Sequence, residues 1–125
     1  MEYKSLSSRG VITKWVNKKI EVDAKDEFHD LINFLKNLER DLWTRPEYAP
    51  FSPEISELRW DNGGKLQHRV FGFFILEAQQ YVMVIGATKK GKEYTPSEAV
   101  QTAINRKKEI LKDKSLIKEY KNGDE

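Results

Sequence analysis

The sequence contains no cysteine, and its only histidines are His29 and His68. Without cysteine, neither a disulfide framework nor a thiolate metal site is possible, and two histidines do not supply a structural zinc site. Glycine-rich phosphate loops of the dinucleotide or P-loop form are missing, and so are acidic clusters with metal-ligand spacing. We therefore expect no metal and no cofactor, which argues against a metal-dependent nuclease.

Long apolar runs are also missing from the 125 residues. The longest fall far below the ~20 residues that a membrane helix needs, and the first residues show no apolar segment of a signal peptide. We therefore expect a cytoplasmic protein that makes no membrane contact. The length fits one domain with a single core, and the 14 aromatic residues argue against disorder.

Charge is unevenly distributed, although the net charge is only +2. Residues 1–20 carry five Lys or Arg against one acid, residues 21–60 carry five against ten, and residues 88–120 carry nine against five. Such asymmetry indicates either one side that faces a polyanion and another that is acidic, or simply charged helix surfaces.

Helical spacing of apolar residues predicts two helices in the first third of the chain. The first covers residues 8–19 with Ser8 as its cap, and the second covers residues 24–43 with Asp23 as its cap. His29 would lie on the surface of the second helix. Three prolines then predict a loop over residues 44–54.

Three strands are predicted next, over residues 55–61, 66–77 and 81–88. An Asp-Asn-Gly-Gly turn at 61–64 joins the first two, because Asn and Gly tolerate positive φ. The third strand is nearly continuous in apolar residues, which is typical of a central position. Residues 3–7 add a possible edge strand.

The segment Thr95-Pro96-Ser97-Glu98 has the pattern of a capping box with proline at the first helical position. It predicts a helix to about Leu111, followed by a further short helix over 114–120. The fold class is therefore α+β, with an N-terminal helix pair, an antiparallel sheet of three to four strands and a C-terminal helix.

Four motifs carry a family resemblance: Ile-Ser-Glu-Leu-Arg-Trp at 55–60, His-Arg-Val-Phe-Gly-Phe-Phe at 68–74, the strand at 82–92 with its Lys-Lys pair, and Thr-Pro-Ser-Glu-Ala-Val at 95–100. In this order and spacing they resemble the RelE/ParE superfamily, and are most similar to its phage-derived, HigB-like branch. The resemblance covers residues 9–120, so that residues 1–125 form one toxin domain. Gly72, where a bulkier residue is common, departs from the pattern.

The resemblance implies a RelE-like microbial RNase fold and the toxin of a type II toxin–antitoxin system. Such a toxin is a metal-independent endonuclease that cuts mRNA on the ribosome and inhibits translation. Its partners would be the ribosome, mRNA and a cognate antitoxin of the helix-turn-helix type, and the free toxin would be a monomer. Two alternatives remain: a ParE-like toxin that binds DNA gyrase without nuclease activity, and an inactive prophage module that binds nucleic acid.

Metal-free RNA cleavage needs a group that takes the proton of the 2′-OH, cations that stabilise charge on phosphorus, and a proton donor for the 5′ oxygen. Arginine suits the second task. Arg59 and Arg69 match family motifs on neighbouring strands, and alternation predicts both on one open face. Arg59 could instead be a surface charge or a partner of Glu57 or Glu77.

The Lys-Lys-Gly-Lys loop is the next candidate, since Lys89, Lys90 and Lys92 could contact phosphate. We group Lys89 and Lys90 with the catalytic set and Lys92 with the RNA contacts; a solvated turn is the alternative. Tyr94 could stack on a base or donate a proton, or could simply pack at the helix start.

We assign further RNA contacts to Arg106, Lys107 and Lys108. The alternative interpretation is that these three residues simply form a solvated face of the helix. His68 is included with them because it is the histidine nearest the candidate site. A regular strand would point it away from Arg69 as a structural or solvent-facing residue, whereas a bulge would bring the two together.

Overall fold

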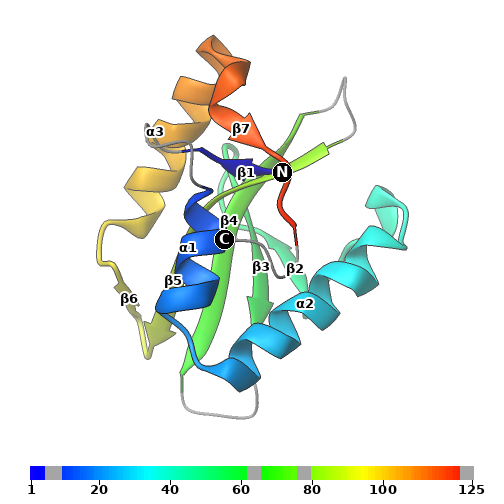
Figure 1. Cartoon of the computed structure of the whole chain (residues 1–125), viewed down its shortest axis with the longest axis vertical. Coiled ribbons are helices and arrows are strands. Elements are labelled where there is room, and N and C mark those ends of the chain that lie inside the picture. The colour runs from blue at the N-terminus through cyan, green and yellow to red at the C-terminus, as the bar shows by residue number, and fades with distance from the viewer. Residues whose placement is uncertain (5–9, 62–65, 76–79, 122–125) are drawn as a thin grey trace.

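The computed structural model describes residues 1–4, 10–61, 66–75 and 80–121. Within these residues, seven strands form one sheet in the order β2-β3-β4-β5-β1-β7, and β6 pairs with β5. The strands are β1 (Glu2–Tyr3), β2 (Tyr48–Pro50), β3 (Ser56–Trp60), β4 (Gln67–Ile75), β5 (Gln80–Lys90), β6 (Glu93–Thr95) and β7 (Ile117–Lys118). The α-helices are α1 (Val11–Lys18), α2 (Val22–Lys36) and α3 (Ala99–Lys112), and two 3₁₀ turns cover Arg40–Leu42 and Lys114–Leu116. The fold is α+β (Figure 1).

The predicted meander is confirmed as β3, β4 and β5, which pair antiparallel in chain order, with β5 central. The expectation of three to four strands was too low, because short segments extend the sheet on both sides. The proline-rich loop contains β2, and the predicted helix over 114–120 is a 3₁₀ turn followed by β7. Strand β1 lies between β5 and β7 and is not an edge strand.

Helices α1 and α2 cover one face of the sheet, and α1 crosses β5 in Figure 1. Their core residues pack on Leu58, Val70 and Met83. Helix α2 is shorter than predicted, ending at Lys36. Just beyond it, the indole Nε1 of Trp43 donates to the carbonyls of Leu35 (3.0 Å) and Leu38 (3.3 Å), which folds the chain back onto the helix end.

The predicted caps of these two helices are not the ones that the structure has. The backbone caps are Gly10 and Glu21, and Asp23 lies inside the first turn of α2. Ser8 falls outside the described residues. His29 is half-buried rather than a surface residue, since its Nε2 lies 2.8 Å from the Tyr120 hydroxyl.

Helix α3 covers the other face, where Ala99, Ala103 and Ile110 pack on Phe71 and Phe73. It begins at Ala99, so the capping box does not form. Thr95 is occupied by pairing with Thr88 in the sheet, and the Ser97 hydroxyl donates to the Glu98 carboxylate (2.8 Å). Near the end of this helix Leu111 is 55% exposed, whereas Ile110 is fully buried.

A β-bulge lies where the register between β4 and β5 shifts at Phe71 and Gly72. The extra residue, Val84, is buried on the α3 side, and its carbonyl accepts a hydrogen bond from Arg106 Nη1 (2.7 Å). A Cβ on Gly72 would overlap the Val82 carbonyl, which explains the glycine in this strand. The bulge lies beyond His68 and Arg69, so these two keep opposite directions.

Candidate active site

Arg59 on β3 and Arg69 on β4 are paired directly across the two strands. Side chains of paired residues share a face, and here it is the α3 face that also carries Phe71 and Phe73. The predicted common face is therefore confirmed, but it is only partly open at these two positions. The exposed fraction of the side chain is 28% for Arg59 and 5% for Arg69.

Glu57 lies between these arginines, two residues before Arg59 on the same strand. Its Oε1 is 3.5 Å from Arg59 Nε, and its Oε2 is 3.7 Å from Arg69 Nε. Two cations directly opposite each other on a sheet repel, and a shared carboxylate offsets that repulsion. Glu57 Oε2 and Arg69 Nε are nevertheless buried without a hydrogen-bond partner among the described residues. Unsatisfied buried groups are costly, and a catalytic role or a bound ion is among the reasons for which native structures keep them.

Arg69 is held in place by its own strand. Its Nη1 donates to the His68 carbonyl (2.9 Å), and its Nη2 donates to Gln67 Oε1 (2.5 Å). Each Nη nitrogen keeps a second hydrogen, so the fork retains donors. Burial lowers the pKa of Arg69, an effect that Glu57 opposes. Because arginine is not deprotonated in proteins, the side chain remains a guanidinium at neutral pH.

Tyr94 and Lys89 meet beside this cluster because β6 folds back onto β5 and pairs them. Lys89 Nζ lies 5.4 Å from the centre of the Tyr94 ring, and that ring packs against Phe71 at 5.6 Å. Burial raises the pKa of Tyr94, and the carboxylate of Glu57 raises it further, although both arginines act in the opposite direction. Tyr94 thus keeps its phenolic proton at neutral pH and can act as a donor.

The other two lysines of the predicted loop are placed differently. Lys89 and Lys90 both belong to β5, and only Gly91 and Lys92 form the turn, where Gly91 has φ of 61°. Lys90 follows Lys89 and therefore points to the opposite face, paired in register with Glu93. Lys92 is exposed at the turn. The structure therefore brings Lys89 to the arginine face, but it does not bring Lys90 or Lys92 there.

His68 lies on the opposite face and is only 3% exposed. Its ring stacks on Trp60, with centres 5.2 Å apart and planes inclined by 15°. Burial lowers the pKa of His68, while the charge of Glu21 acts in the opposite direction. The expected contact of His68 with RNA is therefore corrected. Its ring is buried in the core on the α2 side and is not available to RNA.

The three basic residues of α3 also separate. Arg106 bonds to the Val84 carbonyl and covers the Tyr3 ring at 4.7 Å, so it packs α3 onto the sheet. Lys107 Nζ donates to the Glu54 carbonyl (2.6 Å) and lies 5.3 Å from the centre of the Phe73 ring. Lys108 is exposed. Packing accounts for Arg106 and Lys107, and Lys108 remains accessible for a contact.

A groove of about 680 Å³ reaches both arginines from the edge of the sheet. Arg59, Arg69 and Gln67 form one wall. Helix α2 and the segment before β2 form the other, which includes Glu27, Asp30 and Glu47. The cations are thus bordered by carboxylates on the α2 side, so an anionic ligand is favoured from the α3 side.

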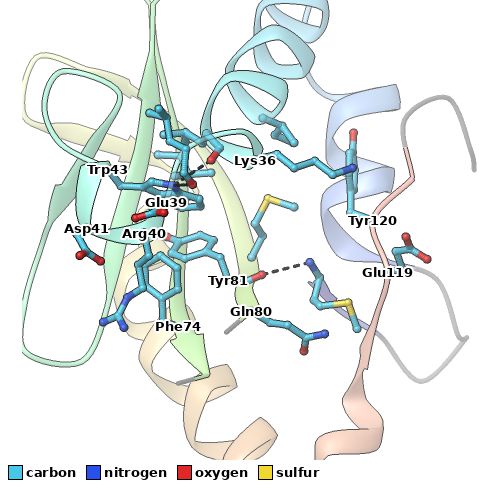
Figure 2. Close-up of a pocket in the computed structure, with 16 residues that line it drawn as sticks. Lys36, Glu39, Arg40, Asp41, Trp43, Phe74, Gln80, Tyr81, Glu119 and Tyr120 are labelled. Carbon is cyan, nitrogen blue, oxygen red and sulfur yellow. Dashed lines mark hydrogen bonds between the residues drawn. The ribbon is translucent and has the colours of Figure 1, made fainter. Parts of the chain in front are cut away.

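A hollow of about 780 Å³ lies on the α2 side of the sheet (Figure 2). Figure 2 shows Trp43, Phe74 and Tyr81 on one side of it and Tyr120 across from them. The Tyr81 carbonyl accepts a hydrogen bond from the amine of Met1 (3.2 Å). Burial raises the pKa of the Tyr81 hydroxyl, so it stays protonated. Although larger, this hollow does not contain the paired arginines that a phosphate would need.

Gln67 and Phe51 are site residues that the sequence did not identify. Glu57 was expected only as a possible partner of Arg59, and the ion pair at 3.5 Å confirms that contact. The i, i+2 spacing on a strand, which places Glu57 on the same face as Arg59, could have added it to the site. Phe51 contacts Phe71 only through the tertiary fold, at 5.3 Å. Within the described ranges, no group of three His, Asp or Glu side chains could hold a metal ion. The helices of this same part of the chain are too short or too polar to cross a membrane.

Comparison with known proteins gives one family. Residues 16–108 match the family model described as phage-derived protein Gp49-like (DUF891). This match spans α1 from Val16 through most of α3, and it therefore includes the whole arginine cluster. Searches of curated proteins and of solved structures found no match.

Proposed function

Because the chain belongs to the phage-derived Gp49-like family, which lies within the RelE/ParE-like toxin superfamily, we propose that it is a ribosome-dependent mRNA endonuclease. It would be the toxin of a type II toxin–antitoxin system, of the HigB-like branch and with a RelE-like RNase fold. Its partners would be a helix-turn-helix antitoxin, the ribosome and translated mRNA.

The observation that carries this proposal is the group of Glu57, Arg59, Arg69 and Tyr94 on one face. Two guanidinium groups beside one carboxylate and a protonated phenol supply an anion site together with proton-transfer groups. A protein that acts only by binding gyrase has no need for a buried carboxylate between two arginines. The cluster therefore favours the nuclease over the gyrase-binding alternative.

The reaction that fits the cluster is transesterification. The 2′-OH loses its proton to the Glu57 carboxylate, and the 2′ oxygen attacks phosphorus. The bond between phosphorus and the 5′ oxygen then breaks, and Tyr94 gives its proton to that oxygen. Arg59 and Arg69 stabilise the charge that develops on the phosphoryl oxygens. The products are a 2′,3′-cyclic phosphate and a free 5′-OH, and neither a metal nor a cofactor takes part.

Ribosome dependence is proposed because the cluster is small and partly buried. Alignment of the scissile phosphate by the target can replace binding energy that a small protein lacks. An antitoxin would block activity by covering this face, or by making the protein too bulky to enter the ribosome.

The test is primer extension on a translated mRNA incubated with purified protein, with and without ribosomes. We expect new 3′ ends that require ribosomes and that disappear in a Glu57→Gln/Arg59→Ala variant. Efficient, codon-independent cutting of free RNA would contradict the ribosome dependence. Intact mRNA under both conditions, with arrested growth in cells, would contradict the nuclease and favour a binding toxin. Co-expression with a helix-turn-helix protein encoded next to this chain should give a stable complex on size exclusion.

A further inference from the structure

Phe51 is an aromatic residue that is 41% exposed and lies beside the arginine cluster. It lies between β2 and β3 and meets Phe71 edge-on, with centres 5.3 Å apart and planes inclined by 82°. Phe71 is fully buried and contacts Tyr94 with planes inclined by 64°. The α3 face therefore carries two accessible rings, Phe51 and Tyr94, that both pack on one buried ring.

The turn that carries Phe51 is rigidly built. Its backbone N–H and that of Ser52 both donate to the Ile55 carbonyl, at 3.1 and 3.0 Å. The Ser52 hydroxyl oxygen accepts from the backbone N–H of Glu54 and Ile55. Helix α3 holds the same turn through Lys107, which donates to the Glu54 carbonyl. An exposed aromatic ring on a fixed turn loses little conformational entropy when a ligand stacks on it.

The sheet sets a lower limit on the spacing between this ring and the arginines. Phe51 packs on Phe71, and Arg69 lies two residues from Phe71 on the same face. Two residues along a strand span about 7 Å, and the Phe51 ring centre lies 5.3 Å from that of Phe71. A ligand that covers both the ring and the arginines needs a flat apolar part and an anionic part joined by a spacer, which is the chemistry of a nucleotide.

Charge favours the same ligand. Lys107 lies next to the turn that carries Phe51, and Lys89 lies next to Tyr94. Lysines therefore flank the two rings, just as the two arginines flank Glu57. A stacking surface bordered by cations is typical of sites for single-stranded nucleic acid, whereas the apolar centre of a protein interface is depleted in charge.

We propose that Phe51 is a stacking platform for one base of single-stranded RNA whose phosphate lies at Arg59 and Arg69. The inference rests on the proposed function, since it uses the same arginine site and extends it to the recognition of a base. The ring stacks without reading base identity, because each base has a π-face.

The experiment compares adenosine 5′-monophosphate with ribose 5-phosphate, which lacks the base, by NMR titration of the full chain. We expect both compounds to shift the Nε signals of Arg59 and Arg69. Only the nucleotide should shift the ring signals of Phe51, and it should bind about 5- to 150-fold more tightly, the usual contribution of stacking one base.

Variants separate the ring from the fold. Phe51→Leu keeps an apolar side chain and should reduce the affinity ratio of the two compounds to near one, while Phe51→Trp should preserve it. The matched control is Phe74→Leu, since Phe74 is half-buried at the hollow on the α2 side, on the opposite face of the sheet. Thermal melts show whether each variant is folded.

Each result then decides one question. Equal affinities for the two compounds, or a ratio that survives Phe51→Leu, would overturn the stacking platform and leave the phosphate site standing. If neither compound shifts the arginine signals, the phosphate site of the proposed function fails, and the platform fails with it.

Discussion

Arg59 and Arg69 face each other across β3 and β4, and one carboxylate, that of Glu57, lies within 3.7 Å of the Nε atom of each. The arrangement concentrates two positive charges at a place where a sheet would normally avoid them. It also makes the two arginines unequal, because Arg59 retains contact with solvent and Arg69 is almost enclosed.

Substitution of Arg59 should separate activity from stability. We expect Arg59→Ala to reduce ribosome-dependent cleavage by about 10²–10³, the usual cost of losing one contact to transition-state charge. Its melting temperature should fall less than that of Arg69→Ala, since the Arg59 side chain is 28% exposed and solvent weakens its ion pair. Primer extension and thermal melts measure the two effects. Lys89→Ala should reduce activity less than Arg59→Ala does. Lys108→Ala is the matched control. Full activity of folded Arg59→Ala would refute the site.

Arg69→Ala should lose both activity and stability. Removing one partner of a buried ion pair costs about 3–5 kcal/mol, and the Gln67 and His68 acceptors would be left without a donor. Urea unfolding should show this loss, with Arg59→Ala for comparison. Equal unfolding midpoints for the two alanine variants would show that the burial of Arg69 has no energetic consequence.

Glu57→Gln tests the carboxylate with almost no change of shape. We expect cleavage to fall by about 10²-fold, as for a misplaced catalytic group, because the amide neither pairs with the arginines nor accepts the proton. Primer extension measures the rate, and thermal melts show whether the variant is folded. Full activity of folded Glu57→Gln would show that the carboxylate takes no part in the reaction.

His68 makes stability depend on pH. Burial lowers its pKa in the folded protein below the ordinary value of 6.5, so the unfolded chain binds the proton first. The free energy of unfolding should therefore fall as the pH drops through 6.5 and level off below the folded pKa. His68→Phe keeps the stack on Trp60 and should reduce this fall. His29, whose pKa is also lowered by burial, serves as a comparison through His29→Gln. An identical pH dependence of the wild type and His68→Phe would exclude the effect.

Arg106 should behave as a structural residue. Arg106→Ala removes the donor for the Val84 carbonyl at the bulge, and a buried acceptor left unsatisfied costs about 1–3 kcal/mol. We expect a lower melting temperature, whereas Lys108→Ala should have almost none of this effect. The binding of single-stranded RNA should change little in folded Arg106→Ala at low temperature. A large loss of binding with no loss of stability would restore Arg106 to the RNA-contact set.

Local pattern determined much of this protein before any tertiary contact was considered. Apolar pattern located both N-terminal helices, the three central strands and the last helix, because each helix buries one stripe and the central strands are rich in apolar residues on both faces. Alternation along β3 and β4 placed Arg59 and Arg69 together, and it turned His68 away from them. The Lys-Lys-Gly-Lys segment predicted a loop, but Lys89 and Lys90 belong to β5. The Thr-Pro motif predicted a helix cap, but the helix begins later, at Ala99.

Tertiary structure decided what those features become. Thr95 pairs with β5 instead of capping a helix, and β6 thereby brings Tyr94 over Phe71. Pairing with neighbours also turned two weak segments into β2 and β7, since short strands gain their hydrogen bonds from other strands and not from their own residues. The burial of Arg69 and the contact of Phe51 with Phe71 depend on side chains distant in sequence, and local pattern contains no record of such contacts.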